Sequence, residues 1–455
     1  MCHVSLLWKA LFLEKPLHLQ HLYALSLMEE VYKRVKLGYT PGEMITDILY
    51  RCPLCGGFDW LTDSRCALCS ASIDILSRSE ISINNQPRSI AYWYDKVLGF
   101  DLPAPAGGII MKSRRVRLSK EVEKDVYKGF SGVIATQYTR AYADEGILSL
   151  KENALLFTGG SQSITIDFGR ILGVTIESNT IILISRDHGA LFLDFLEESG
   201  KKWEDCIRKI LIRYFSGNNI VEFYPRIRLE NDLRERPSSS KGHKHLHVPV
   251  RRWYKRDYSP IFAAVRSIAK PVIKTFFRVD ISGTDNIPEH GGAVVLANHT
   301  SFLDSIILGV FPARNIWFMA KNSEYKNSLL TWALKRARAF PVRRYTTDVQ
   351  ALRNAIRIVE QGHILGIFPE GERTWDGRLL PFRYGTMRLV LALGKPLIPV
   401  GISGAYELMP RWTSSIKRVP VKIRIGKPQH FDHIPIPQQT KRDIEHVSSF
   451  IRDHI

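Results

Sequence analysis

The sequence predicts an α/β domain with a mixed or parallel sheet and flanking helices in its C-terminal part, preceded by a zinc ribbon and a small, mainly β domain. Three observations predict this arrangement. Apolar strands alternate with helices after residue 278, two C-x-x-C pairs lie within residues 51–72, and short strands follow one another through residues 131–216. A length of 455 residues allows about three domains.

The positive charge of the chain lies mainly in its C-terminal part. The formal net charge is +19, from 64 Lys and Arg against 45 Asp and Glu. Residues 1–250 hold 32 basic and 29 acidic side chains, whereas residues 251–455 hold 32 basic and 16 acidic ones. A surplus of this size is typical of proteins that meet nucleic acid, a membrane or a phosphorylated substrate. The apolar fraction of 45% excludes a wholly disordered chain.

The four clustered cysteines predict one structural zinc ion. Two C-x-x-C pairs suit tetrahedral coordination, because each pair supplies two thiolates from a tight turn. Disulfides or unbridged thiols are the alternative, but few other cysteines are present. Four protein ligands leave no open position, so a catalytic role for the metal is not expected. We assign residues 51–72 to a zinc ribbon with the ligands Cys52, Cys55, Cys66 and Cys69.

Other segments of the front half are less informative. Residues 1–50 have apolar positions at helix spacing and are expected to be largely helical. Residues 73–130 are expected to be an irregular or helical connector, and residues 217–257 a basic linker. The linker contains alternating histidines that could bind a metal, although a solvated linker is the simpler interpretation: His243, His245 and His247.

Residues 131–216 are expected to form a β domain with a C-terminal helix. Turn residues separate the predicted strands at 147–150, 154–157, 163–168, 171–176, 180–185 and 190–195. Strands in series closed by one amphipathic helix resemble pleckstrin-homology-like domains, including the membrane-associated GRAM type. That resemblance implies binding of lipid headgroups or peptides, and a purely structural β domain is the alternative.

Residues 258–277 form an apolar segment whose cations recur every four residues. Arg266, Lys270 and Lys274 fall on one stripe of a predicted helix, which suits a membrane surface, and Pro271 is expected to kink it. An ordinary packing helix is the alternative. The sequence shows no run of about 18 uncharged apolar residues, so no spanning helix is predicted. No signal peptide is recognised, and we expect a peripheral or monotopic location on the cytoplasmic side of a membrane.

Residues 258–455 are expected to form the α/β domain. The predicted strands are 293–297, 316–319, 339–342, 364–368, 397–402 and 421–425, and the helices between them include 301–311, 348–361 and 385–393. Sites in open α/β sheets lie at the carboxyl ends of the strands. Residues that follow the strands directly are therefore the candidates for chemistry.

His299 and Asp304 follow the first of these strands in an H-x4-D pattern. On one continuous helix a five-residue offset would point the two side chains apart. They can meet if His299 lies on the turn before the helix and Asp304 within its first turn. The carboxylate could then hold the imidazole tautomer and stabilise the imidazolium, as in a base–orienter pair.

Three further blocks complete the pattern: Arg338 to Arg344, then Phe368-Pro-Glu-Gly-Glu-Arg373, then Ile398-Pro399-Val400. Together with Asn298-His299-x-Ser301-x-x-Asp304 they resemble the glycerolipid acyltransferase family, whose best-known activity is the acylation of 1-acylglycerol-3-phosphate. The resemblance covers roughly residues 260–435.

The resemblance implies a role for each block. It implies catalytic roles for His299 and Asp304 and phosphate binding by Arg344. It implies acceptor binding by Glu370, Gly371 and Arg373, and it places Ile398, Pro399 and Val400 on the acyl-donor side. This chain departs from the common pattern with Arg338 in place of Gly, Arg343 in place of an acidic residue, and Glu372 in place of Thr.

The function implied by the resemblance is acyl transfer from acyl-CoA or an acyl-carrier protein to the hydroxyl of a lysophospholipid at the membrane surface. The expected reaction converts 1-acyl-glycerol-3-phosphate to phosphatidic acid, and the expected partners include anionic membrane lipid. Alternatives are O- or N-acylation of another acceptor, or a lipid- or nucleic-acid-binding scaffold. Nucleic acid is not expected as a partner, because the half that holds the ribbon is nearly neutral.

Overall fold

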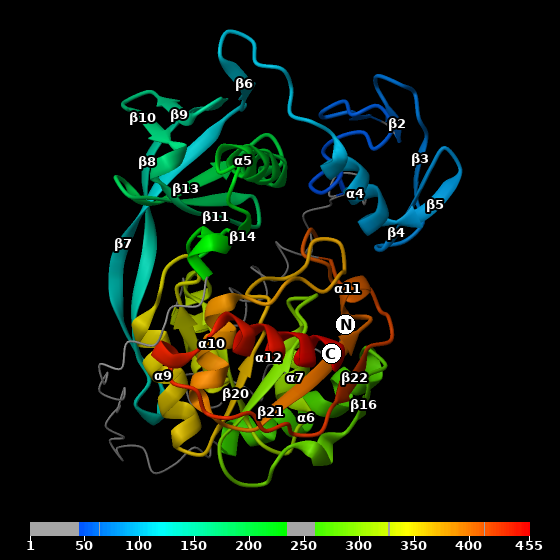
Figure 1. Cartoon of the computed structure of the whole chain (residues 1–455). Helices are drawn as coiled ribbons and strands as arrows, with labels where there is room; N and C mark the ends of the chain where they lie inside the picture. Colours follow the sequence, from blue (N-terminus) through cyan, green and yellow to red (C-terminus); the bar gives the residue numbers. More distant parts are fainter. Residues whose placement is uncertain (1–44, 63, 234–259, 326–327, 414) are drawn as a thin grey trace, which may run out of the picture.

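The computed structural model describes residues 45–62, 64–233, 260–325, 328–413 and 415–455 (Figure 1). Most of the predicted N-terminal helical segment lies outside these residues. So does the linker beyond residue 233, with His243, His245 and His247.

The N-terminal unit holds the cysteine cluster and a small antiparallel sheet. Ser89 caps the helix that follows the sheet, because its hydroxyl accepts the backbone N–H of Tyr92 at 3.2 Å. Trp93 of this helix donates its indole N–H to Ile81 O at 3.0 Å, which fixes the helix on the sheet. The elements are β1 (Leu61–Thr62), β2 (Arg65–Cys66), β3 (Ile73–Ile75), β4 (Glu80–Ile83), β5 (Gln86–Ser89) and α4 (Ile90–Gly99).

The β domain is an antiparallel sheet with strand order β10-β9-β8-β7-β13-β12-β11, in which β6 also pairs with β8. The predicted strands are all found, and α5 (Gly200–Tyr214) follows them. The likeness to pleckstrin-homology domains stays a prediction. The strands are β6 (Ile109–Lys112), β7 (Val116–Lys128), β8 (Ile134–Lys151), β9 (Ala154–Gly159), β10 (Ser163–Asp167), β11 (Ile171–Glu177), β12 (Thr180–Ser185) and β13 (Gly189–Phe195).

Strands β6 and β7 correct the expectation of an irregular or helical connector at residues 73–130. β7 pairs with β8 along its whole length, yet its outer half is exposed and mostly charged. Two register shifts also interrupt the pairing, so no apolar alternation marks this strand in the sequence. The β7–β8 hairpin reaches down to the C-terminal α/β domain, where Tyr127 donates to Ala339 O at 2.6 Å (Figure 1).

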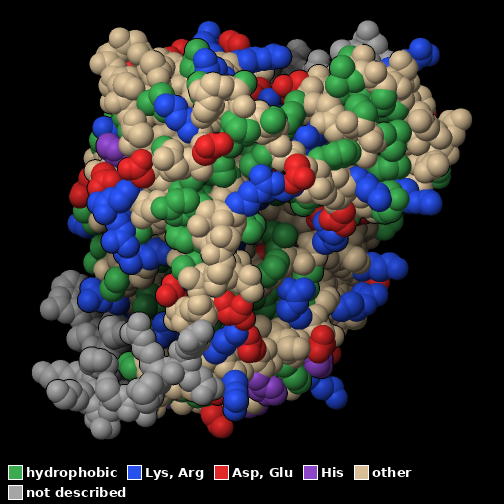
Figure 2. Space-filling view, turned by 45° about the horizontal axis from the view of Figure 1, so that its top comes forward, with side chains coloured by type: hydrophobic (Ala, Val, Ile, Leu, Met, Phe, Trp, Pro, Cys, Tyr) green, Lys and Arg blue, Asp and Glu red, His purple; other side chains and the backbone are tan. Residues whose placement is uncertain are grey.

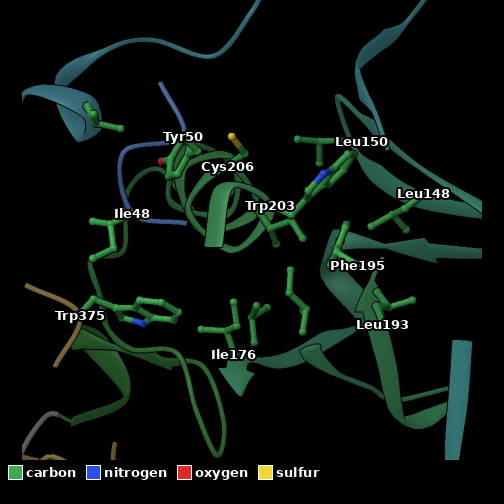
Figure 3. Close-up of a cluster of buried hydrophobic side chains, with 14 of the residues drawn as sticks. Ile48, Tyr50, Leu148, Leu150, Ile176, Leu193, Phe195, Trp203, Cys206 and Trp375 are labelled. Atoms are coloured by element: carbon green, nitrogen blue, oxygen red, sulfur yellow. The ribbon is translucent and has the colours of Figure 1, made fainter. Parts of the chain in front are cut away.

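A hydrophobic core joins the N-terminal unit to the β domain and extends to the C-terminal α/β domain. Trp203 of α5 is fully buried and stacks on Phe195 with ring centroids 5.5 Å apart. Figure 3 shows Tyr50 of the N-terminal unit and Trp375 of the C-terminal domain beside the same helix. Burial of several large apolar side chains stabilises such a contact by roughly 1.5–3 kcal/mol each. The three parts therefore form one packed body.

The C-terminal α/β domain is built on a mixed sheet with strand order β16-β22-β21-β17-β20-β18-β19. All neighbours are parallel except β21 and β22, which confirms the predicted sheet class. A short hairpin, β14 (Ile220–Glu222) and β15 (Arg228–Leu229), precedes the domain. The strands are β16 (Asp280–Ser282), β17 (Ala293–Ala297), β18 (Ile316–Lys321), β19 (Ala339–Val342), β20 (Ile364–Ile367), β21 (Leu397–Ser403) and β22 (Lys422–Ile425).

Helices cover both faces of this sheet. Asp348 and Thr440 cap two of them with side-chain hydrogen bonds, and each cap satisfies an N–H that the helix itself leaves unpaired. The helices are α6 (Pro260–Phe276), α7 (Asp304–Val310), α8 (Ser328–Arg336), α9 (Val349–Glu360), α10 (Tyr384–Leu393), α11 (Ala405–Leu408) and α12 (Lys441–Asp453). Among the described helices, none is both long enough and apolar enough to cross a membrane.

Candidate active site

His299 lies at the carboxyl edge of the sheet, two residues after β17. The preceding residue, Asn298, is clamped to β21 by two hydrogen bonds. Its side-chain N–H donates to Ile402 O at 2.8 Å, and its oxygen accepts the Ile402 N–H at 2.7 Å. The central strand and its neighbour thus fix the start of the loop that carries His299.

Asp304 holds the imidazole of His299. His299 Nδ1 lies 3.0 Å from Asp304 Oδ2, and the same oxygen accepts the backbone N–H groups of Thr300 and Ser301 at 2.7 and 2.8 Å. Asp304 begins α7 and is completely buried, while His299 lies on the preceding turn, as the spacing required. A carboxylate only accepts hydrogen bonds, so Nδ1 carries the proton and Nε2 keeps its lone pair.

The surroundings of His299 favour its neutral form. The ring stacks on Phe368 with centroids 4.0 Å apart, and the side chain is 18% exposed. Burial lowers the pKa of His299, and the charges of Arg373 and Arg344 lower it further, although Asp304 opposes this shift. Because the pKa falls below its ordinary value, the imidazole is available as a base at neutral pH.

Glu370 is a brace for the His299 loop in this conformation. Its Oε1 accepts the backbone N–H of His299 at 2.6 Å, and its Oε2 accepts that of Leu380 at 2.7 Å. The residue is 1% exposed, and burial raises the pKa of Glu370 to about 8. Glu370 was expected to bind the acceptor substrate, but both of its carboxylate oxygens accept hydrogen bonds from the backbone.

Gly371 is required by its conformation and by its neighbours. Its φ of +73° lies in the left-handed region that favours glycine. A Cβ at this position would lie 2.8 Å from the hydroxyl oxygen of Tyr224. The Gly371 carbonyl accepts a 2.7 Å hydrogen bond from Arg344 Nη1, so the Phe368–Arg373 loop helps to position Arg344.

Arg344 belongs to a cation pair that also contains Lys321. Lys321 ends β18, next to β19, and Arg344 follows β19 two residues after its end. Both cations contact Glu177 of the β domain: Lys321 Nζ lies 2.6 Å and Arg344 Nη2 lies 3.2 Å from its carboxylate. Lys321 was not among the predicted site residues, although residues at the carboxyl ends of strands in such sheets are candidates for a site.

Two residues that depart from the common pattern form ion pairs with other elements of the chain. Arg343 lies 3.4 Å from Glu121 and its guanidinium covers the ring of Tyr138 at 4.2 Å, both in the β domain. Glu372 is ion-paired with Arg383 and Arg411. Both residues therefore make contacts between elements that are distant in the sequence.

The remaining predicted residues divide into two groups. Arg373 is half-buried near His299, where burial lowers its pKa to about 10. Ile398, Pro399 and Val400 are buried in β21 beside β17, and Ile398 and Val400 are 0% exposed. The structure thus brings His299, Asp304, Arg344 and the Phe368–Arg373 loop together, but leaves the expected acyl-donor block inside the sheet.

The four cysteines of the N-terminal unit form one cluster that could hold a metal ion. Their Sγ atoms all lie within 4.8 Å of one another. The distances from Cys52 to Cys69 and from Cys55 to Cys66 are 3.8 and 3.6 Å. Four thiolates at about 2.3 Å from one tetrahedral zinc ion would lie about 3.8 Å apart. The donor set and its spacing therefore fit zinc.

Comparison with known proteins points to one family. Residues 278–403 match the family model described as Acyltransferase. The chain is 30% identical over 160 residues to 1-acyl-sn-glycerol-3-phosphate acyltransferase BAT2, chloroplastic, of Brassica napus, which covers 34% of this chain and 46% of that protein. It is 28% identical over 179 residues to the 1-acyl-sn-glycerol-3-phosphate acyltransferase of Bacillus subtilis (strain 168), covering 38% and 87%.

The solved structures that are similar to the chain include a bacterial acyltransferase. The 1-acyl-sn-glycerophosphate acyltransferase PlsC from Thermotoga maritima is 26% identical, covers 42% of this chain and 81% of its own, and has a TM-score of 0.32. A TM-score of this size does not establish a shared fold. The chain spans about half the length of the first relative, and the family match lies within the C-terminal α/β domain.

Proposed function

Since residues 278–403 form a domain of the acyltransferase family, we propose that the chain transfers a fatty acyl group to a lysophospholipid. The donor is a thioester, acyl-CoA or an acyl-carrier protein. The acceptor is 1-acyl-glycerol-3-phosphate, and the product is phosphatidic acid. The observation that carries the proposal is the His299–Asp304 pair at the carboxyl edge of the sheet, with cations beside it.

In the proposed reaction His299 is the general base. Its Nε2 takes the proton of the acceptor hydroxyl while that oxygen attacks the thioester carbonyl. The tetrahedral intermediate then breaks its C–S bond, and the imidazolium returns the proton to the departing thiolate. Asp304 keeps the tautomer that leaves Nε2 free and stabilises the imidazolium. The products are an ester and a free thiol, and no covalent enzyme intermediate is needed.

The proposed acceptor phosphate lies against Arg344, Lys321 and Arg373. A planar guanidinium suits a phosphate because it donates two parallel hydrogen bonds. The positive charges of Arg373 and Arg344 lower the pKa of His299. This supports the proposal that both cations lie near the hydroxyl that His299 deprotonates. A phosphate there would place the glycerol hydroxyl of the acceptor within reach of the base.

The proposed site of action is a membrane surface. α6 carries an exposed apolar stripe at i, i+4 and i+8, formed by Ile268, Val272 and Phe276, and Lys270 and Lys274 are exposed beside it. Arg266 instead holds Ala313 O and the side chain of Asn315, so it is not part of this surface. On the face seen in Figure 2, Lys and Arg are spread over both halves of the molecule.

The cysteine cluster is proposed to hold one structural zinc ion. We expect metal analysis of the purified chain to find about one zinc per molecule. Cys66→Ser should lose the metal and lower the unfolding temperature, because the ion would hold the two loops that carry the cysteines together. Cys206→Ser is the matched control, since this buried cysteine lies outside the cluster and should keep the zinc. Wild-type protein without zinc would remove the assignment.

The acceptor is tested by offering the enzyme a panel of alcohols. The full chain is incubated with palmitoyl-CoA and vesicles containing lysophosphatidate, lysophosphatidylcholine, monoacylglycerol or a long-chain amine. We expect lysophosphatidate to give the highest rate of thiol release, because it alone presents a terminal phosphate monoester to the cations. Equal rates with lysophosphatidate and monoacylglycerol would contradict the assignment of the phosphate.

A further inference from the structure

The β domain places a buried carboxylate on the cation pair Lys321 and Arg344. Glu177 is the last residue of β11, and its side chain is 4% exposed. Its Oε2 lies 2.6 Å from Lys321 Nζ, and its Oε1 lies 3.2 Å from Arg344 Nη2. Burial alone would raise the pKa of Glu177, but these two cations and Arg140 lower it to about 2. Glu177 is therefore ionised at neutral pH.

The strand end that carries Glu177 is fixed to the C-terminal α/β domain. Arg411 donates to the carbonyl of Ile176 at 2.5 Å, and Glu222 of β14 accepts the backbone N–H of Tyr384 at 2.9 Å. The pocket at this seam, lined in part by Glu177 and Lys321, has a volume of about 20 Å³. Such a volume holds about one water molecule and no glycerophosphate. The carboxylate of Glu177 also occupies the contacts of Lys321 Nζ and Arg344 Nη2, so a phosphate bound by both cations must displace it.

We propose that Glu177 occupies the acceptor-phosphate subsite, so that this conformation is closed and the acceptor must displace an internal carboxylate. A carboxylate against Lys and Arg makes the same charge-assisted hydrogen bonds as a phosphate, with one negative charge in place of nearly two. The same cations cannot hold both anions fully. This inference rests on the proposed function, because that function makes the cation pair the phosphate subsite.

Replacement of the Glu177 carboxylate by the acceptor phosphate leaves no charged group without a partner. Arg140 of β8 lies 3.5 Å from Glu177, and it also contacts Thr180 and Asp194 of the same domain. When the end of β11 that carries Glu177 moves away from the cations, Arg140 of the same domain remains its counter-ion. Lys321 and Arg344 then receive the phosphate. This keeps the cost of opening below that of exposing an uncompensated buried charge.

The test in the wild-type chain is hydrogen exchange with sn-glycerol 3-phosphate as the probe and glycerol as the neutral control. We expect saturating glycerol 3-phosphate to speed amide exchange in residues 171–185, which form β11, β12 and their turn. Glycerol should have no effect. Slower or unchanged exchange on binding would overturn the inference, because the phosphate would then join Glu177 instead of replacing it. Absence of binding would overturn the subsite itself.

The test by substitution compares Glu177→Gln with Glu123→Gln, an exposed carboxylate on β7 that loses the same charge. We expect Glu177→Gln to tighten glycerol 3-phosphate binding and to lower the KM for lysophosphatidate by about 5- to 150-fold, with the control unchanged. Weaker binding would show that Glu177 helps to build the site. If the probe binds as expected but no acyl transfer occurs, the proposed function fails and the inference about Glu177 stands.

Discussion

Replacing His299 by alanine is expected to lower the rate of acyl transfer by at least about 100-fold, and by up to about 10⁴-fold. The alcohol of the acceptor is hardly ionised at neutral pH, so attack on the thioester needs a base beside it. His299 is the proposed base, and its Nδ1 lies 3.0 Å from Asp304 Oδ2. Thiol release from acyl-CoA in the presence of lysophosphatidate measures the loss.

The His299→Ala variant should remain folded, which makes the result interpretable. Asp304 keeps its hydrogen bonds from the backbone N–H groups of Thr300 and Ser301, so it is not left unpaired. His188→Ala, in the exposed turn between β12 and β13, is the matched control and should keep full activity. Wild-type rates in His299→Ala would remove the catalytic assignment.

The Glu372→Ala substitution is expected to destabilise the chain by about 3–5 kcal/mol. Its carboxylate lies between Arg411, at 2.7 Å and 4% exposed, and Arg383. Alanine would leave the buried Arg411 and the partly buried Arg383 without their counter-ion. Burial alone would raise the pKa of Glu372, but Arg411 and Arg383 lower it to about 2. The stabilisation is therefore present above the ordinary carboxyl pKa of 4.5 and is lost as the pH falls toward 2.

An exposed ion pair supplies the control for Glu372. Asp95 of the N-terminal unit lies 2.8 Å from Arg378, and the two side chains are 56% and 49% exposed. Solvent screens this pair, so Asp95→Ala should cost less than about 1 kcal/mol. Denaturant unfolding at neutral pH compares the two variants. A cost for Glu372→Ala no larger than that for Asp95→Ala would contradict the role of the buried network.

The sequence predicted best those features that depend on local pattern. β17 and β19 have the predicted bounds, because each is a short apolar run that ends at a polar loop. The contact between His299 and Asp304 followed from a five-residue spacing across a turn. The cysteine cluster followed from two C-x-x-C pairs. In each case the interacting residues are close in the sequence.

Features that depend on distant contacts escaped prediction. Glu177 and Arg344 are 167 residues apart, and no sequence pattern near Glu177 predicts that it contacts the C-terminal α/β domain. β7 looked irregular because most of its outer half faces solvent. The sequence also did not predict that Glu370 binds the His299 backbone or that Ile398, Pro399 and Val400 lie within the sheet. A motif identifies residues, but it does not show which atoms their side chains contact.

Acyl transfer to a lysophospholipid is tested most directly by following a labelled acyl group. The full chain is given acyl-CoA with a ¹³C-labelled acyl chain and vesicles of 1-acyl-glycerol-3-phosphate, and the lipids are analysed by mass spectrometry. We expect labelled phosphatidic acid in an amount equal to the thiol released. Thiol release with the label in free fatty acid, or no release at all, would contradict acyl transfer to the lysophospholipid.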